Sequence, residues 1–174
     1  MPANQWYADY AVKAAQAGLM QGTGGGKFSP DGTLTVAEVV TLTARLYAER
    51  QGESVPVVSG MWYQGAYDYC IENGLFMASE VPLSTMMNKA TRFQMVDLLD
   101  RAVPEEEKQV INVVFNGEIP DVQETDPYGP VVYLWYRAGI VEGDSSGRFH
   151  GNTNISRAET AAILCRLADL TPRV

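Results

Sequence analysis

A glycine-rich stretch at residues 22–29, GTGGGKFS, has the residue types that bind nucleotide phosphates. A P-loop requires a glycine, four residues, and then Gly-Lys-Ser/Thr at the start of a helix that follows a strand. Gln21 stands in place of the first glycine here, Phe28 replaces the hydroxyl that would bind magnesium, and the preceding apolar residues have helical spacing. We therefore predict no nucleotide site and expect these glycines to serve backbone geometry.

Acidic side chains offer two further candidates for chemistry. Glu142 and Asp144 form a carboxylate pair of the kind that hydrolases use, but both fall in one loop and no partner is identifiable across a cleft. The run Asp144–Gly147 starts like a calcium loop but lacks the later ligands of an EF-hand. The sequence therefore predicts that the protein is not an enzyme and that it has no metal site and no cofactor.

The cysteines and the histidine do not form a site in sequence terms. Cys70 and Cys165 have neither metal-binding spacing nor a disulfide framework, and both lie in apolar helical patterns, so we expect buried free thiols. His150 is the only histidine in the sequence, which excludes any site that needs two, and its place in a loop predicts exposure to solvent.

Composition limits the partners. The 174 residues are 46% hydrophobic and carry a formal charge of −8, which disfavours a nucleic acid or an anionic membrane surface as partner. No apolar run approaches the ~18 residues of a membrane span. The first residues, MPANQWYADY, lack the basic and apolar regions of a secretory signal, so we expect either a cytoplasmic protein or a fragment whose signal lies elsewhere.

An internal repeat accounts for the glycines. Three segments of thirteen residues align without gaps on their final glycines: WYADYAVKAAQAG ending at Gly18, WYQGAYDYCIENG ending at Gly74, and PYGPVVYLWYRAG ending at Gly139. Each has apolar residues at helical spacing, which predicts a short helix stopped by a glycine just beyond its C-terminal cap. The loop that follows also recurs, as GTGGGKFS at residues 22–29 and GDSSGRFH at residues 143–150.

A second helix is predicted in every repeat. Seventeen residues after each of those glycines stands a hydroxyl residue, and three residues later an acid or amide: Thr35 with Glu38, Thr91 with Gln94, and Ser156 with Glu159. This spacing is the capping box, in which two side chains close the first helical turn. Its recurrence at one offset indicates three further helices.

These elements predict an all-α fold. Three helix-loop-helix repeats at residues 6–50, 62–103 and 121–170 are joined by spacers at 51–61 and 104–120. Two short helices cannot bury an apolar face alone, so the repeats are expected to form one compact domain over residues 1–174, with the capped helices meeting at its centre. The second spacer starts with proline and acids and then turns apolar, which predicts one extra helix.

Arginines and tryptophans stand where packing alone does not require them. Arg92 and Arg157 directly follow a cap residue, where a cation opposes the helix dipole. An anionic ligand would explain them, because exposed backbone N–H groups favour negative charge there and a guanidinium suits a carboxylate. The alternative is an arginine turned toward a neighbouring acid or solvent. Trp6 and Trp62 open their repeats, either as packing residues or as platforms for the apolar face of a sugar.

The repeated elements resemble the S-layer homology (SLH) domain family. In the first repeat they read Trp6, GLMQG at residues 18–22, FSPD at residues 28–31 and LTVAE at residues 34–38. In the third they read GIVEG at 139–143, FHGN at 149–152 and ISRAE at 155–159, with Asp121 in a Pro-Asp-Val lead-in. The second repeat is the weakest, since Ala78 and Ser84 replace the loop glycine and phenylalanine, although Thr91-Arg92 remains.

This resemblance implies a pseudo-threefold bundle, with the capped helices at its centre and grooves between neighbouring repeats. It also implies a non-catalytic module of the bacterial cell surface, cell wall or S-layer, which has no membrane span, binds no nucleic acid and belongs to a larger exported protein. Its partner would be secondary cell-wall polysaccharide, often carrying a pyruvate ketal on an amino sugar. Glycan-binding roles would fall to Arg157, Arg92, Trp6, Trp62 and Asp121.

A competing hypothesis is a protein-interaction or assembly module that keeps the SLH fold with partial or no glycan binding. Three departures from the family pattern favour it. The first repeat has Val36 where the others have an arginine, the third has Pro127 where the others have a tryptophan, and the second has an altered loop.

Overall fold

The computed structural model describes residues 5–174, and the described chain is helical with no strand. Its α-helices are α1 (Ala8–Gln16), α2 (Val36–Gln51), α3 (Gln64–Glu72), α4 (Arg92–Asp100), α5 (Gly129–Arg137) and α6 (Arg157–Leu167). The all-α class and the helix-loop-helix unit are thereby confirmed. Residues 1–4, with which the expected domain begins, lie outside the described residues.

The first helix of each repeat ends in the same way. Gly18, Gly74 and Gly139 have φ values of 71°, 70° and 67°, so each adopts the left-handed conformation that stops a helix. The N–H of the next residue reaches back to the third-last helical carbonyl at 2.9 Å in all three cases: Leu19 to Ala14, Leu75 to Cys70, and Ile140 to Trp135. These bonds satisfy carbonyls at the helix end, and they confirm the predicted glycine stops.

The second helix of each repeat begins with a complete capping box. Thr35, Thr91 and Ser156 each accept a hydrogen bond from the backbone N–H three residues later, and the side chain of that residue accepts from the cap backbone in return. The three predicted capping boxes are confirmed.

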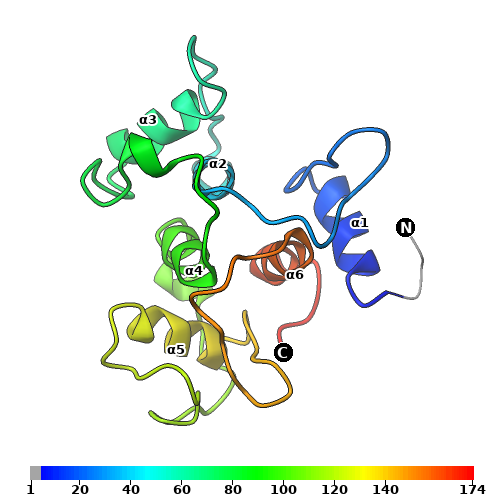
Figure 1. The fold of residues 1–174 in the computed structure, drawn as a ribbon, viewed down its shortest axis with the longest axis vertical. Coiled ribbons are helices and arrows are strands. Elements are labelled where there is room, and N and C mark those ends of the chain that lie inside the picture. Colours follow the sequence, from blue (N-terminus) through cyan, green and yellow to red (C-terminus); the bar gives the residue numbers. More distant parts are fainter. Residues whose placement is uncertain (1–4) are drawn as a thin grey trace.

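The repeats follow one another in a closed cycle (Figure 1). The capped helices α2, α4 and α6 lie near the middle of the view, and α1, α3 and α5 lie outside them. Each outer helix packs on the capped helix of the preceding repeat, α3 on α2 and α5 on α4, and α1 closes the cycle by packing on α6. The pseudo-threefold symmetry of this arrangement stays a prediction.

Three backbone hydrogen bonds close a ring where the capped helices start. Leu34 N donates to Ile155 O at 3.2 Å, Ile155 N donates to Ala90 O at 3.1 Å, and Ala90 N donates to Leu34 O at 2.9 Å. Each residue belongs to a different repeat and lies just before a cap residue. The ring therefore joins all three repeats through their backbones alone.

The first N–H groups of the capped helices are also occupied. Two per helix donate to carbonyls of a neighbouring repeat, at 2.8–3.0 Å: Val36 and Ala37 to Asn88 and Met86, Arg92 and Phe93 to Thr153 and Gly151, and Arg157 and Ala158 to Gly32 and Pro30. The third N–H donates to the cap hydroxyl. The expectation that these groups are exposed and available to an anion is therefore wrong, because inter-repeat contacts use them.

One apolar cluster runs through all three repeats and includes the fully buried Trp135 of α5, whose Nε1 donates to Asp100 at 2.7 Å. Cys70 and Cys165 are buried free thiols, as expected, and burial raises the pKa of Cys70 to about 12. Among the six helices, none combines the length and apolarity needed to cross a membrane.

The second spacer does not form the predicted extra α-helix. It contains a three-residue 3₁₀ turn, Glu105–Glu107, followed by irregular backbone. The N–H groups of Ile111 and Asn112 both donate to the carbonyl of Arg137 at the end of α5, which holds the segment against that helix. The consecutive apolar residues Val113, Val114 and Phe115 do not have helical spacing, so proline and acids were an insufficient signal.

Candidate functional site

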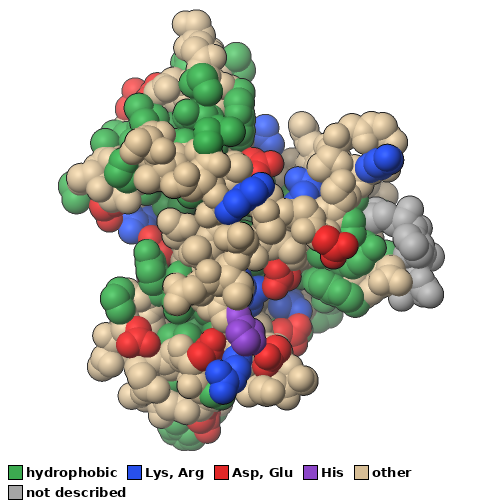
Figure 2. All heavy atoms as spheres, in the orientation of Figure 1, with side chains coloured by type: hydrophobic (Ala, Val, Ile, Leu, Met, Phe, Trp, Pro, Cys, Tyr) green, Lys and Arg blue, Asp and Glu red, His purple; other side chains and the backbone are tan. Residues whose placement is uncertain are grey.

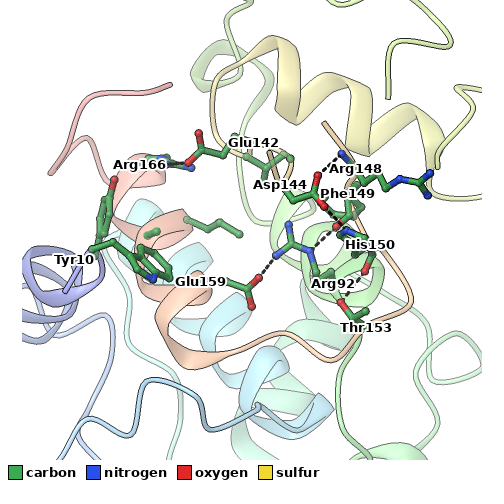
Figure 3. Close-up of a pocket in the computed structure, with 15 residues that line it drawn as sticks. Tyr10, Arg92, Glu142, Asp144, Arg148, Phe149, His150, Thr153, Glu159 and Arg166 are labelled. Carbon is green, nitrogen blue, oxygen red and sulfur yellow. Dashed lines mark hydrogen bonds and ion pairs between the residues drawn. The ribbon is translucent and has the colours of Figure 1, made fainter. Parts of the chain in front are cut away.

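A cavity of about 620 Å³ opens where the first and third repeats meet. Trp6 and Tyr10 border it on one side, α6 forms a second wall, and the loop at residues 141–150 forms a third. Figure 3 shows Tyr10, Arg166 and Glu142 on one side of the cavity and Arg92, Asp144 and His150 on the other. Figure 2 shows acidic and basic side chains gathered around a hollow beside the histidine.

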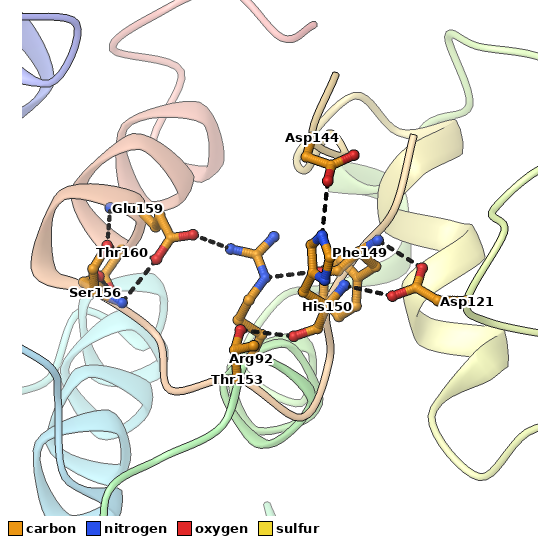
Figure 4. A network of polar contacts seen from close by, with 9 residues as sticks. All are labelled: Arg92, Asp121, Asp144, Phe149, His150, Thr153, Ser156, Glu159 and Thr160. Carbon is orange, nitrogen blue, oxygen red and sulfur yellow. Dashed lines mark hydrogen bonds and ion pairs between the residues drawn. The ribbon is translucent and has the colours of Figure 1, made fainter. Parts of the chain in front are cut away.

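Arg92 reaches the cavity from the second repeat. Its Nε donates to the carbonyl of Phe149 at 2.8 Å, and its Nη1 donates to Glu159 at 2.6 Å (Figure 4). The guanidinium carbon lies 4.7 Å from the centroid of the Phe149 ring. The side chain is 11% exposed, and its Nη2 has no hydrogen-bond partner among residues 5–174. Arg92 is thus turned toward a neighbouring acid, yet it keeps donors for a further group.

The loop at residues 143–150 requires glycine at two positions. A Cβ on Gly143 would lie 2.5 Å from the backbone of Gly147, and Gly147 has a φ of 74°, so both positions require glycine. Gly22 and Gly26 are alike, the first with a carbonyl 2.8 Å from an added Cβ and the second with a φ of 70°. The prediction that these glycines serve backbone geometry is confirmed.

Two aspartates fix the end of this loop. Asp121 accepts hydrogen bonds from the backbone N–H groups of Phe149 and His150, both at 2.8 Å (Figure 4). Asp144 lies 2.8 Å from His150 Nε2. This hydrogen bond, followed by those from the backbone of Arg148 and Ser146, lowers the pKa of Asp144 to about 2. Asp121 therefore holds the wall of the cavity and does not itself line it.

Arg157 makes the equivalent contacts at another junction. Its Nε donates to the carbonyl of Phe28 at 2.8 Å, its Nη2 donates to the carbonyl of Gln21, and its guanidinium carbon lies 5.1 Å from the Phe28 ring centroid. Among the described residues, no carboxylate lies close enough to the Arg157 guanidinium to form an ion pair. Burial lowers the pKa of Arg157, and the nearby charge of Glu38 opposes that shift. The guanidinium thus remains a cation without a paired acid.

Each arginine works with the loop of the next repeat, and not with the loop of its own. Arg92 of the second repeat holds Phe149 of the third, and Arg157 of the third holds Phe28 of the first. Val36 of the first repeat would face the loop of the second, where Ser84 replaces the phenylalanine. The arginine and the phenylalanine are therefore absent from the same junction.

The two tryptophans are placed differently. Both are 59% exposed and lie two residues before the start of their helices, so each presents its ring to solvent. Trp6 borders the cavity with Tyr10, whose ring centroid is 6.3 Å away. Trp62 lies outside it. The cavity thus brings together Trp6 and Arg92 of the predicted residues, with Asp121 behind its wall.

Among the residues that line the cavity, sequence reasoning did not predict a binding role for Tyr10, Glu142 or Arg166. Arg166 recurs with Arg101 at one offset after the cap, a signal visible in the sequence. The sequence could not indicate that α1 lies on α6. This packing places the ring centroid of Tyr10 5.8 Å from the guanidinium carbon of Arg166.

Comparison with known proteins distinguishes the first and third repeats from the second. The family model of the S-layer homology domain matches residues 1–40 and 118–161, which are the first and third repeats. The chain is 27% identical over 179 residues to the surface-layer 125 kDa protein of Lysinibacillus sphaericus. That alignment covers 97% of this chain and 15% of the relative, so the chain spans a small part of its relative's length.

Proposed function

We propose that the chain is a non-catalytic cell-surface anchoring module of the S-layer homology family, because the family model matches segments of its first and third repeats and the similar protein is a surface-layer protein. Its ligand is the anionic secondary polysaccharide of a bacterial cell wall, and the acidic group is a pyruvate ketal. The low coverage of the relative supports a larger exported protein as the whole, with this chain as its anchor.

One observation carries this proposal: the cavity joins an exposed indole to a guanidinium with free donors. An indole 59% exposed offers a face against which the apolar side of a sugar ring can stack. The Nη2 of Arg92 offers N–H groups suited to a carboxylate. The volume of about 620 Å³ falls within the roughly 300–1,000 Å³ of small-molecule sites.

The cyclic order of the repeats supports a second junction of the same design, with Trp62 and Arg157. Trp6 precedes α1, which packs on α6, and the adjoining loop is held by an arginine. One step around the cycle, Trp62 precedes α3, which packs on α2, and the adjoining loop is held by Arg157. Since Arg157 has no paired acid among residues 5–174, we expect this junction to attract an anionic group more strongly than the junction of Arg92.

The third junction favours the second candidate function, a protein-interaction or assembly surface. It has Val36 in place of the arginine, Ser84 in place of the phenylalanine, and Pro127 in place of the tryptophan. Large apolar side chains of the second repeat are also exposed, namely Met77, Leu83 and Met87. These features support a role beyond glycan binding for this part of the chain.

A pull-down on purified cell walls tests the proposal, with walls used intact and after chemical removal of pyruvate. We expect binding to intact walls, loss after depyruvylation, and loss in the double variant Arg92→Gln/Arg157→Gln. Arg50→Gln is the matched control, because Arg50 forms an ion pair with Glu107 outside the cavity. Equal binding to both walls, or full binding by the double variant, would contradict the proposal and leave the assembly function in front.

A further inference from the structure

The cavity has a second polar end, opposite Arg92. Arg166 of α6 donates through Nη2 to Glu142 at 2.9 Å and through Nη1 to the carbonyl of Ile140 at 3.1 Å. The Arg166 side chain is 5% exposed and that of Glu142 is 63% exposed. Figure 3 shows this pair beside Tyr10 and across the cavity from Arg92. A buried arginine therefore fixes one oxygen of an exposed carboxylate.

The second repeat contains the same pairing of an arginine with a carboxylate, Arg101 with Glu80. Arg101 borders a separate pocket of about 390 Å³, but Glu80 does not line it. Arg101 donates to the carbonyl of Leu75 at 3.0 Å, as Arg166 does to Ile140, and it pairs with Glu80 at 3.1 Å. The other oxygen of Glu80 accepts a hydrogen bond from the backbone N–H of Met77 at 2.7 Å. The other oxygen of Glu142 has no partner within the described residues. The free acceptor oxygen thus belongs to Glu142, the carboxylate of the two that lines a cavity.

An ion pair lies at each end of the cavity. Glu142 is paired with Arg166, and Arg92 on the opposite side is paired with Glu159. A carboxylate already paired with a guanidinium does not call for a second cation. Its free oxygen is suited to neutral donors, because an ionised acceptor strengthens a hydrogen bond from an O–H or N–H group.

We propose that Glu142, positioned by Arg166, binds the hydroxyl or amide N–H groups of a neutral sugar unit that adjoins the acidic unit. This inference rests on the proposed function, in which Arg92 binds the acidic unit and Trp6 stacks on a sugar ring. The cavity then recognises two consecutive units of the glycan, with donors at one end and an acceptor at the other.

Isothermal titration with two synthetic probes tests this reading. One probe is a pyruvylated monosaccharide, and the other is the same sugar extended by one N-acetylhexosamine. We expect Glu142→Gln to weaken binding of the disaccharide about tenfold, the loss of one charge-assisted hydrogen bond, and to leave binding of the monosaccharide unchanged. Arg92→Gln should weaken both probes.

Glu80→Gln is the matched control. It removes the carboxylate that pairs with Arg101, as Glu142→Gln removes the one that pairs with Arg166, but Glu80 lies outside the cavity. Thermal melts of both glutamine variants show whether either change disturbs folding, and Glu142→Asp supplies a second variant that keeps the charge but shortens its reach. The acceptor role is overturned if Glu142→Gln weakens both probes equally or neither. If no probe binds the unaltered chain, the proposed function itself fails.

Discussion

Arg92→Ala should lower stability more than Arg157→Ala, although both arginines follow a cap residue. The 11% exposed Arg92 side chain loses an ion pair to Glu159, a hydrogen bond to Phe149 O and the stacking on its ring. A hydrogen bond to a charged group contributes about 1.5–3 kcal/mol. Glu159 is 36% exposed and keeps its two bonds to Ser156, so it remains solvated, and we expect a net loss of about 2–3 kcal/mol.

The assay is thermal unfolding followed by circular dichroism. For a chain of this size 1 kcal/mol shifts Tm by roughly 2–4 °C, so Arg92→Ala should melt roughly 5–10 °C below the unaltered chain. Arg157→Ala loses hydrogen bonds to two carbonyls but no ion pair, and Arg157 is only partly buried, so solvent offsets more of the loss and we expect about 1–2 kcal/mol. The reasoning would be refuted if Arg92→Ala melted within 1 °C of the unaltered chain. It would also be refuted if Arg157→Ala melted at a lower temperature than Arg92→Ala.

Three further outcomes are expected. Hydrogen bonding lowers the pKa of Asp144 to about 2 in the folded protein. The charged carboxylate therefore stabilises the fold at pH values above the unfolded pKa, and this stabilisation is lost as the pH falls toward the folded pKa. The Tm of Asp144→Asn should be lower than that of the unaltered chain by its full amount at pH 5, and this difference should shrink between about pH 4 and pH 2. Gly143→Ala forces its Cβ to within 2.5 Å of Gly147 and should cost about 1–3 kcal/mol in chemical denaturation, whereas Ser145→Ala in the same loop should be near neutral. ATP or GTP should give no saturable Tm shift; such a shift would revive a nucleotide site at residues 22–29.

Local signals predicted the elements well. The capping boxes and the glycine stops each depend on two or three residues close in sequence, and each recurs at a fixed offset, so the six helices followed from spacing alone. The spacer failed because its signal did not recur: a proline and acids started a turn at Glu105–Glu107, but no helical apolar stripe followed it.

The site was harder to predict because its residues come from different repeats. Arg157 appeared to have a complete set of motifs in its own repeat, yet it holds Phe28, which is 129 residues away in the sequence. Arg92 appeared to sit beside a degraded loop, yet it holds the intact loop at Phe149. Spacing within one repeat does not reveal which neighbouring repeat a side chain faces, and that relation depends on the direction of the cycle.

The backbone ring fixes the size of the array. In an open solenoid a repeat can be added or removed at an end, because each unit contacts its neighbours in a line. Here Leu34 of the first repeat bonds to Ile155 of the third, and Ala90 of the second bonds to both. Deleting one repeat would orphan N–H and C=O groups on both sides of the gap, and a fourth would have no vacant partner. The ring of hydrogen bonds is therefore complete with three repeats, and all three are needed to close it.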